Sequence, residues 1–207
     1  MNPVDLNATS TKPHDSSDAE QRILVSKLFN AISSHDNRAA IQLAPKIHRL
    51  DDYSDPRYCE TPLVAAARYD ASVECMQILL PLSDPLRRGF QKTTPLILAA
   101  HGAAAHSAEL VRLLLPVSDP LATRIDGTTA LHCAINSKQE EIVALLLPHS
   151  DLQHRSSSGR SILDHAKSVN STFANLVLAE MARRESLAIA QEAPLRPELK
   201  SGLASRL

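Results

Sequence analysis

A short motif returns along this chain at nearly constant spacing. Thr-Pro-Leu triplets or close variants of them begin at positions 61, 94, 129 and 161, so the period is about 33 residues. A second mark agrees with the first, because Leu-Leu-Pro triplets begin at positions 79, 114 and 146, and an Asp follows each of them. A fixed period of this length indicates a stack of small units in which each unit contacts only its neighbours.

Each period has room for two helices. Thr and Ser are favoured N-cap residues and Pro is tolerated at the first helical position, so each triplet predicts the start of a first helix. The segment that ends in Leu-Leu-Pro predicts a second helix, because its apolar residues recur at positions i, i+1, i+3 and i+4. In the middle unit these residues are Leu110, Val111, Leu113 and Leu114. The Pro should end that helix, since the residue before a Pro disfavours the helical conformation.

Two further local signals concern helix starts and turns. Ser137 and Glu140 have the spacing of a capping box and predict the start of the second helix in the third unit. Asp126-Gly127 and Ser158-Gly159 are turn-forming pairs, so they predict tight turns before the triplets at 129 and 161.

The repeat resembles the ankyrin repeat, whose Thr-Pro-Leu-His-x-Ala signature is approached most closely by TALHCA at 129–134. The resemblance covers about residues 22–185. It implies an all-α fold, in which stacked helix-turn-helix units joined by hairpin-like loops form a solenoid with a capping unit at each end. The chain departs from the pattern where the signature His and the hairpin Gly are replaced. These positions hold Val64, Ile97 and Asp164 for the His, and Cys59 and Lys92 for the Gly. A tetratricopeptide array is the main alternative, but the Thr-Pro-Leu starts and the Asp-Gly turn argue against it.

The composition predicts a repeat domain between two tails. Residues 1–20 are rich in small polar residues without hydrophobic periodicity, so we expect a disordered arm, with order beginning near the capping-box pair Ser17 and Glu20. Residues 192–207 contain Pro and Gly without a sustained period and are expected to form a flexible tail. The domain between them divides into units at about 21–50, 51–83, 84–118, 119–150 and 151–191.

The last unit should end in a long helix that begins after Asn170. Three of its apolar residues are expected to face inward, namely Phe173, Leu176 and Val177. Arg183, Arg184 and Glu185 are expected to face water, because a stacked array needs a polar outer cap to stay in solution.

Charge and cysteine content exclude several classes of protein. Lys and Arg number 22 against 23 Asp and Glu, so the net charge of −1 argues against a general nucleic-acid or anionic-membrane binder. Three widely spaced cysteines without a CxxC pair suggest neither a disulfide framework nor a zinc ribbon. With no signal-peptide or bilayer-spanning run, we expect a monomeric cytoplasmic protein. Other destinations stay open, because Ser205-Arg206-Leu207 resembles a peroxisomal address and the Ser/Thr-rich arm would suit a bacterial effector.

Catalytic motifs are missing from the sequence. The five glycines form no phosphate loop, nucleotide fingerprint or GxSxG elbow, and there is no HExxH. His101 and His106 are five residues apart, as are His149 and His154, which places neither pair on one helical face for metal binding. We therefore expect no enzyme, cofactor or metal, but an adaptor or scaffold that binds another protein. A regulatory subunit or effector that recruits or occludes a host enzyme is the alternative, and an enzyme with dispersed residues is a third.

The ankyrin resemblance also implies a binding surface, formed by the hairpin tips and the ends of the first helices. The residues at these positions are Arg57, Tyr58, Glu60, Arg68, Tyr69, Arg88, Phe90, Gln91, His101, Thr123, Ile125, Asp126, Asn136, Arg155 and Arg160. Tyr and Arg often anchor interfaces, and the excess of Arg suggests an acidic patch or segment on the partner. On this hypothesis Arg68→Glu weakens binding without unfolding the protein. The alternative is that these are solvated loop residues, with Tyr69 packed beneath a hairpin. The resemblance gives His132 a structural role, a hydrogen bond to neighbouring loop backbone.

Overall fold

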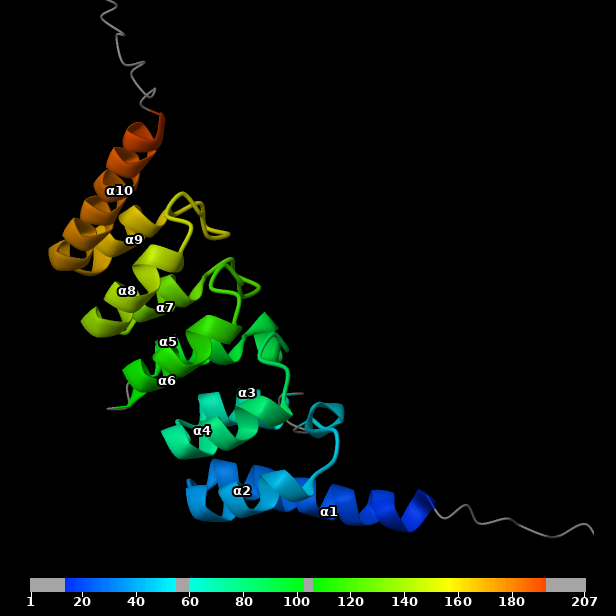
Figure 1. The fold of residues 1–207 in the computed structure, drawn as a ribbon. Coiled ribbons are helices and arrows are strands. Elements are labelled where there is room, and N and C mark those ends of the chain that lie inside the picture. Colours follow the sequence, from blue (N-terminus) through cyan, green and yellow to red (C-terminus); the bar gives the residue numbers. More distant parts are fainter. Residues whose placement is uncertain (1–13, 55–59, 103–105, 193–207) are drawn as a thin grey trace, which may run out of the picture.

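The computed structural model describes residues 14–54, 60–102 and 106–192, and these form a stack of helix pairs (Figure 1). The α-helices are α1 (His14–Ser33), α2 (Asn37–Leu43), α3 (Pro62–Arg68), α4 (Val73–Leu79), α5 (Pro95–His101), α6 (Ser107–Leu114), α7 (Ala130–Asn136), α8 (Glu140–Leu146), α9 (Ile162–Val169) and α10 (Ser171–Glu192). Short 3-10 turns are η1 (Ala44–Lys46), η2 (Leu50–Asp52), η3 (Leu80–Leu82), η4 (Phe90–Lys92), η5 (Leu115–Val117) and η6 (Leu147–His149). The prediction of an all-α solenoid is confirmed.

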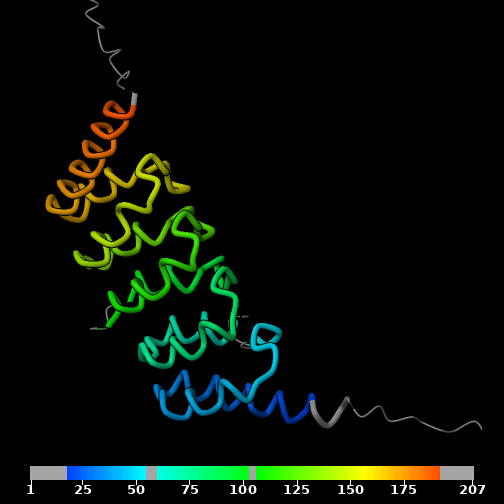
Figure 2. The backbone as a smooth tube through the Cα atoms, viewed as in Figure 1, coloured from blue at the N-terminus to red at the C-terminus, as the bar shows by residue number. Residues whose placement is uncertain are grey.

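The helices form two layers. The odd-numbered helices α1 to α9 pack side by side in one layer, and the even-numbered helices α2 to α10 form the other. The backbone trace shows the loops before α5, α7 and α9 projecting together from one edge of the stack (Figure 2). Across residues 14–54, 60–102 and 106–192, no helix combines the length and apolarity needed to cross a bilayer.

The first helices begin where the repeated triplet predicts. The Thr94 hydroxyl accepts the backbone N–H of Ile97, and the Ser161 hydroxyl accepts that of Asp164. Thr129 is the N-cap of α7 and forms a capping box with His132. Thr61 also precedes α3, but its buried hydroxyl has no hydrogen-bond partner among the described residues. Side-chain capping therefore supports three of these four helix starts.

The second helices bury three of the four predicted apolar positions, so the prediction for Leu113 was wrong. Leu110, Val111 and Leu114 are fully buried, whereas Leu113 is only partly buried. The same offset leaves Ile78 36% exposed in α4. Positions i, i+1 and i+4 lie within about 100° of helix surface, and position i+3 lies outside that arc. The buried face is therefore narrower than the apolar pattern suggests.

Both ends of the second helices carry a local difference from expectation. Each α-helix stops before the Leu-Pro step but continues into a 3-10 turn that includes the Pro, as in η3, η5 and η6. The Ser137–Glu140 capping box is absent. Gln139 is the N-cap of α8 without a side-chain bond, and the Ser137 hydroxyl donates to the His101 carbonyl oxygen instead. A bond to the neighbouring unit has replaced the local cap.

The hairpins with a glycine at the turn differ in backbone geometry from the hairpin that lacks one. Gly127 and Gly159 have φ of 73° and 77°. Each lies in a narrow turn that is closed by an isolated β-bridge, between Thr123 and Thr129 or between Arg155 and Ser161. Lys92 occupies the equivalent position before α5 and adopts φ of 57°, and Gln91 adopts 56°. A side chain in this left-handed region is strained, and the tip of this hairpin is the 3-10 turn η4 rather than a bridge.

Hydrogen bonds join each hairpin to the next. The Ile125 N–H donates to the Gln91 carbonyl at 3.1 Å, and the Ser157 N–H donates to the Asp126 carbonyl at 2.9 Å. His154 Nε2 lies 2.8 Å from the Gly127 carbonyl oxygen. These bonds link backbone segments about one period apart, so the hairpin edge is a connected row.

The C-terminal unit closes the stack with α10. Phe173 and Val177 are buried as predicted, and Leu176 is partly buried. Arg184 does not simply face water: its guanidinium donates to the carbonyls of Leu147 and Ser150, at 2.6 and 2.9 Å. These carbonyls lie at the end of α8 and η6, where backbone oxygens lack helical partners, so a cation is favoured there. At the other end α1 begins at His14, three residues before the predicted start at Ser17. The division into arm, five units and tail stays a prediction.

Candidate protein-binding groove

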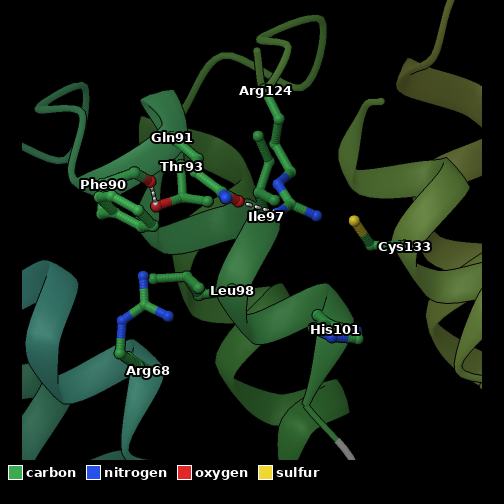
Figure 3. A pocket seen from close by; sticks show the side chains of 9 residues that line it. All are labelled: Arg68, Phe90, Gln91, Thr93, Ile97, Leu98, His101, Arg124 and Cys133. Atoms are coloured by element: carbon green, nitrogen blue, oxygen red, sulfur yellow. Dashed lines mark hydrogen bonds between the residues drawn. The ribbon is translucent and has the colours of Figure 1, made fainter. Parts of the chain in front are cut away.

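Two adjoining cavities lie where the hairpins meet the first helices. The first, called the Phe90 cavity, has a volume of about 230 Å³ and is lined by Arg68, Phe90, Gln91, Thr93, Ile97, Leu98, His101, Arg124 and Cys133 (Figure 3). The second, called the His132 cavity, measures about 220 Å³ and is lined by His101, Arg124, Asp126, Thr128, His132, Cys133, Asn136 and His165. They share His101, Arg124 and Cys133. Together they form one central groove over α5, α7 and the hairpins before them.

Arg124 stands between the two cavities. Its side chain comes from the hairpin before α7, and one terminal nitrogen donates to Gln91 Oε1 at 2.5 Å (Figure 3). Its other terminal nitrogen lies 4.0 Å from Asp126 Oδ2. The guanidinium therefore connects the hairpins of two successive units and still lines both cavities.

Arg68 enters the Phe90 cavity from α3 but is engaged by a buried carboxylate. Its Nε donates to Glu60 Oε2 at 2.7 Å, and a terminal nitrogen pairs with Glu60 Oε1. The Glu60 side chain is 0% exposed and that of Arg68 is 26% exposed. Gly89 makes room for this pair, because a Cβ there would lie 2.6 Å from Glu60 Cγ. The predicted contact role of Glu60 is therefore wrong, and Arg68 is tied to the fold.

Asp126 shapes the hairpin as well as lining the His132 cavity. Its Oδ1 accepts the Thr128 N–H at 3.0 Å and the Thr128 hydroxyl at 2.6 Å. Burial tends to raise the pKa of this carboxyl, but these bonds and Arg124 outweigh it, and the net pKa is lowered. Asp126 is thus a carboxylate whose acceptor capacity is largely used inside the turn.

Three imidazoles meet beneath the His132 cavity. The ring of His132 lies 5.5 Å from that of His165 and 6.0 Å from that of His154. His132 is 2% exposed, and its Nδ1 accepts the Thr129 N–H at 3.3 Å. Burial, followed by the neighbouring imidazoles, lowers the pKa of His132 to about 4. Burial also lowers the pKa of His165. His132 is therefore neutral at pH 7, with its proton on Nε2.

Comparison with protein families decides the identity of the repeat. Residues 100–184 match a family model that describes ankyrin repeats in three copies. The chain contains ankyrin repeats. Among curated proteins, none matches the sequence. Ankyrin repeats generally mediate contacts between proteins and are typically not catalytic, and their stacked units create extended binding surfaces.

Only part of the contact set that the ankyrin resemblance predicts lies in the groove. Six residues line it: Arg68, Phe90, Gln91, His101, Asp126 and Asn136. Ile125 is 60% exposed on the hairpin beside it. Tyr69 is partly buried and packs against the core. Arg88 lines a separate hollow with Asp51 and Arg87, and Arg155 and Arg160 are exposed on the last hairpin. Arg57 and Tyr58 lie outside the described residues.

Sequence reasoning missed several lining residues, among them Arg124, Cys133 and His165. Arg124 lies five residues before Thr129, inside the window that selected Ile125 and Asp126, so the same rule could have found it. Cys133 was interpreted as a core residue, and at 7% exposure it is buried yet borders both cavities. His165 carries no mark in the sequence, because it faces the groove only once α9 is stacked on α7. Within the described segments, no three His, Cys, Asp or Glu side chains form a set that could hold a metal ion.

The buried, neutral side chain of His132 predicts that the folded protein loses stability in acid. An unfolded His has a pKa near 6.5, whereas folded His132 resists protonation until about pH 4. Between these values the unfolded chain binds the extra proton, so stability is retained above pH 6.5 and falls as the pH drops toward 4. Urea melts from pH 7 to pH 4 should show this loss. The loss should shrink in His132→Asn and persist in the exposed control His149→Asn, and equal slopes in all three proteins would contradict it.

Proposed function

We propose that this protein is a non-enzymatic adaptor or scaffold that binds a protein partner through the surface formed by its hairpins and first helices. The observation that carries the proposal is the central groove, in which two cavities share three lining residues. A groove with an apolar and a polar part suits an extended segment better than a small substrate, because each part takes a different side chain. We also propose a cytoplasmic location, which suits the buried free thiols of Cys75 and Cys133.

Exposed apolar residues beside the groove support a protein partner. Phe90 is 52% exposed and Ile125 is 60% exposed, and both lie on hairpin tips next to the cavities. Large apolar side chains that remain exposed beside a hollow are typical anchors of interfaces. The exposed arginines of the hairpins, among them Arg88, Arg155 and Arg160, favour a partner with an acidic patch or segment.

A charge placed on this surface should weaken partner binding. We expect Ile125→Asp to lower the affinity for a partner captured by the full-length chain about tenfold or more, because a carboxylate replaces an apolar contact. Binding is measured by titrating each variant with the purified partner. Ile189→Asp is the matched control, since Ile189 is 63% exposed and lies on α10, away from the groove. Loss of binding in the control, with Ile125→Asp unaffected, would assign the interaction to another face.

A further inference from the structure

Three buried nitrogens of residues that line the His132 cavity have no hydrogen-bond partner among the described residues, namely Nε2 of His165 and two donors. One is Nε of Arg124, whose terminal nitrogens are directed to Gln91 and Asp126. The other is Nε2 of His132, which carries the ring proton because Nδ1 accepts the Thr129 N–H. A buried donor without an acceptor has a cost in free energy, because it has lost its hydrogen bonds to water. A ligand that brings acceptor oxygens into this cavity would remove that cost.

The polar groups around the His132 cavity favour a ligand with acceptor oxygens. Arg124 and three imidazoles, those of His101, His132 and His165, face a single carboxylate, Asp126. The Oδ1 of that carboxylate accepts two hydrogen bonds from Thr128, and Arg124 lies 4.0 Å from its Oδ2. The exposed Arg160 of the next hairpin adds positive charge close enough to act on His165. The cavity is thus rich in donors and poor in free acceptors, which is the complement of a carboxylate.

The Phe90 cavity offers different walls to the same ligand. Ile97, Leu98, Phe90 and Cys133 supply apolar surface, and the guanidinium of Arg68 is engaged by Glu60. In an extended chain, side chains two residues apart lie on the same face, roughly 7 Å from each other. Two neighbouring cavities with shared walls therefore match residues i and i+2 of one extended segment.

We propose that the groove binds an extended acidic segment of a protein partner, with one carboxylate in the His132 cavity on Arg124 and His132. The side chain two residues away is apolar and fills the Phe90 cavity. This inference rests on the proposed function and specifies the partner chemistry for the same groove. The Arg124 guanidinium provides the charge, and the His132 N–H provides a second, neutral donor.

Selection from a random-peptide display library on the full-length protein tests this pairing. Enriched peptides should share an Asp or Glu two positions from a large apolar residue, and Arg124→Met should lose that enrichment. One enriched peptide is then synthesised with Glu and with Gln at the acidic position. We expect the wild-type protein to prefer the Glu peptide about tenfold or more, and Arg124→Met to show little preference. Enrichment of neutral or basic peptides, no enrichment, or a preference that survives Arg124→Met would overturn the proposal.

A second variant tests the proposal independently, in case Arg124→Met fails to fold. Asn136 is exposed at the rim of the His132 cavity, so Asn136→Asp adds a carboxylate there without removing a buried contact. It should weaken binding of the Glu peptide several-fold more than binding of the Gln peptide. The exposed control Asn175→Asp on α10 should weaken binding of neither peptide. Equal effects on both peptides would count against the carboxylate site. A natural partner that is lost with Ile125→Asp but retained with Arg124→Met would leave the proposed function standing and remove this subsite.

Discussion

Replacing Arg68 with Met should lower the free energy of unfolding by about 3–5 kcal/mol, because it leaves the fully buried Glu60 carboxylate without its counter-ion. The two donors that now satisfy Glu60 would be lost together. Arg68→Glu should be at least as harmful, since it places a second carboxylate beside the first. Urea denaturation of the full chain measures the loss.

The converse change provides the control for this pair. Glu60→Gln removes the buried charge and leaves Arg68, which is 26% exposed and can reach water. It should therefore cost clearly less than Arg68→Met, and the double variant Glu60→Gln/Arg68→Met should recover part of the loss. Equal costs for the two single variants would mean that the burial of Glu60 does not determine the energy of the pair.

Leu114→Ala should destabilise the array by about 2–5 kcal/mol, because Leu114 is fully buried in the middle of the stack and truncation leaves a cavity. Leu113→Ala, one residue earlier in the same helix, should cost only about 1 kcal/mol, since that side chain is partly exposed already. Urea melts measure the loss of stability in both variants. The larger loss should also broaden or split the transition, because the damage falls mainly on the units next to α6. A larger cost at Leu113 would contradict the assigned helix face.

The sequence predicted the parts of this fold that depend on local periodicity. Helix starts at Thr94, Thr129 and Ser161 follow from capping chemistry, and the buried face of each second helix follows from its apolar stripe. Leu113 was assigned wrongly because an apolar stripe of four residues is wider than the arc that the neighbouring units cover. Ser137 was assigned wrongly because its capping spacing competes with a carbonyl of the preceding unit.

The groove depended on contacts that local patterns do not encode. The Arg68–Glu60 pair forms because the loop before α3 brings Glu60 beneath the hairpin that contains Gly89. His165 reaches His132 only through the packing of α9 on α7. The family resemblance selected six residues that line the groove, but it could not separate residues tied to the fold from residues that face the cavities.

The hydrogen-bonded row of hairpins bears on how tightly a partner can be held. Successive tips are joined through Gln91 to Ile125 and through Asp126 to Ser157, so their mutual spacing is set before any encounter. Such a surface is rigid, and the distances between its hairpin tips do not change on binding. The entropy lost on association then falls mainly on the partner segment, which must straighten to fit, and little of it on the ankyrin array. A partner segment already held extended by its own fold should consequently bind more tightly than the same residues in a free peptide.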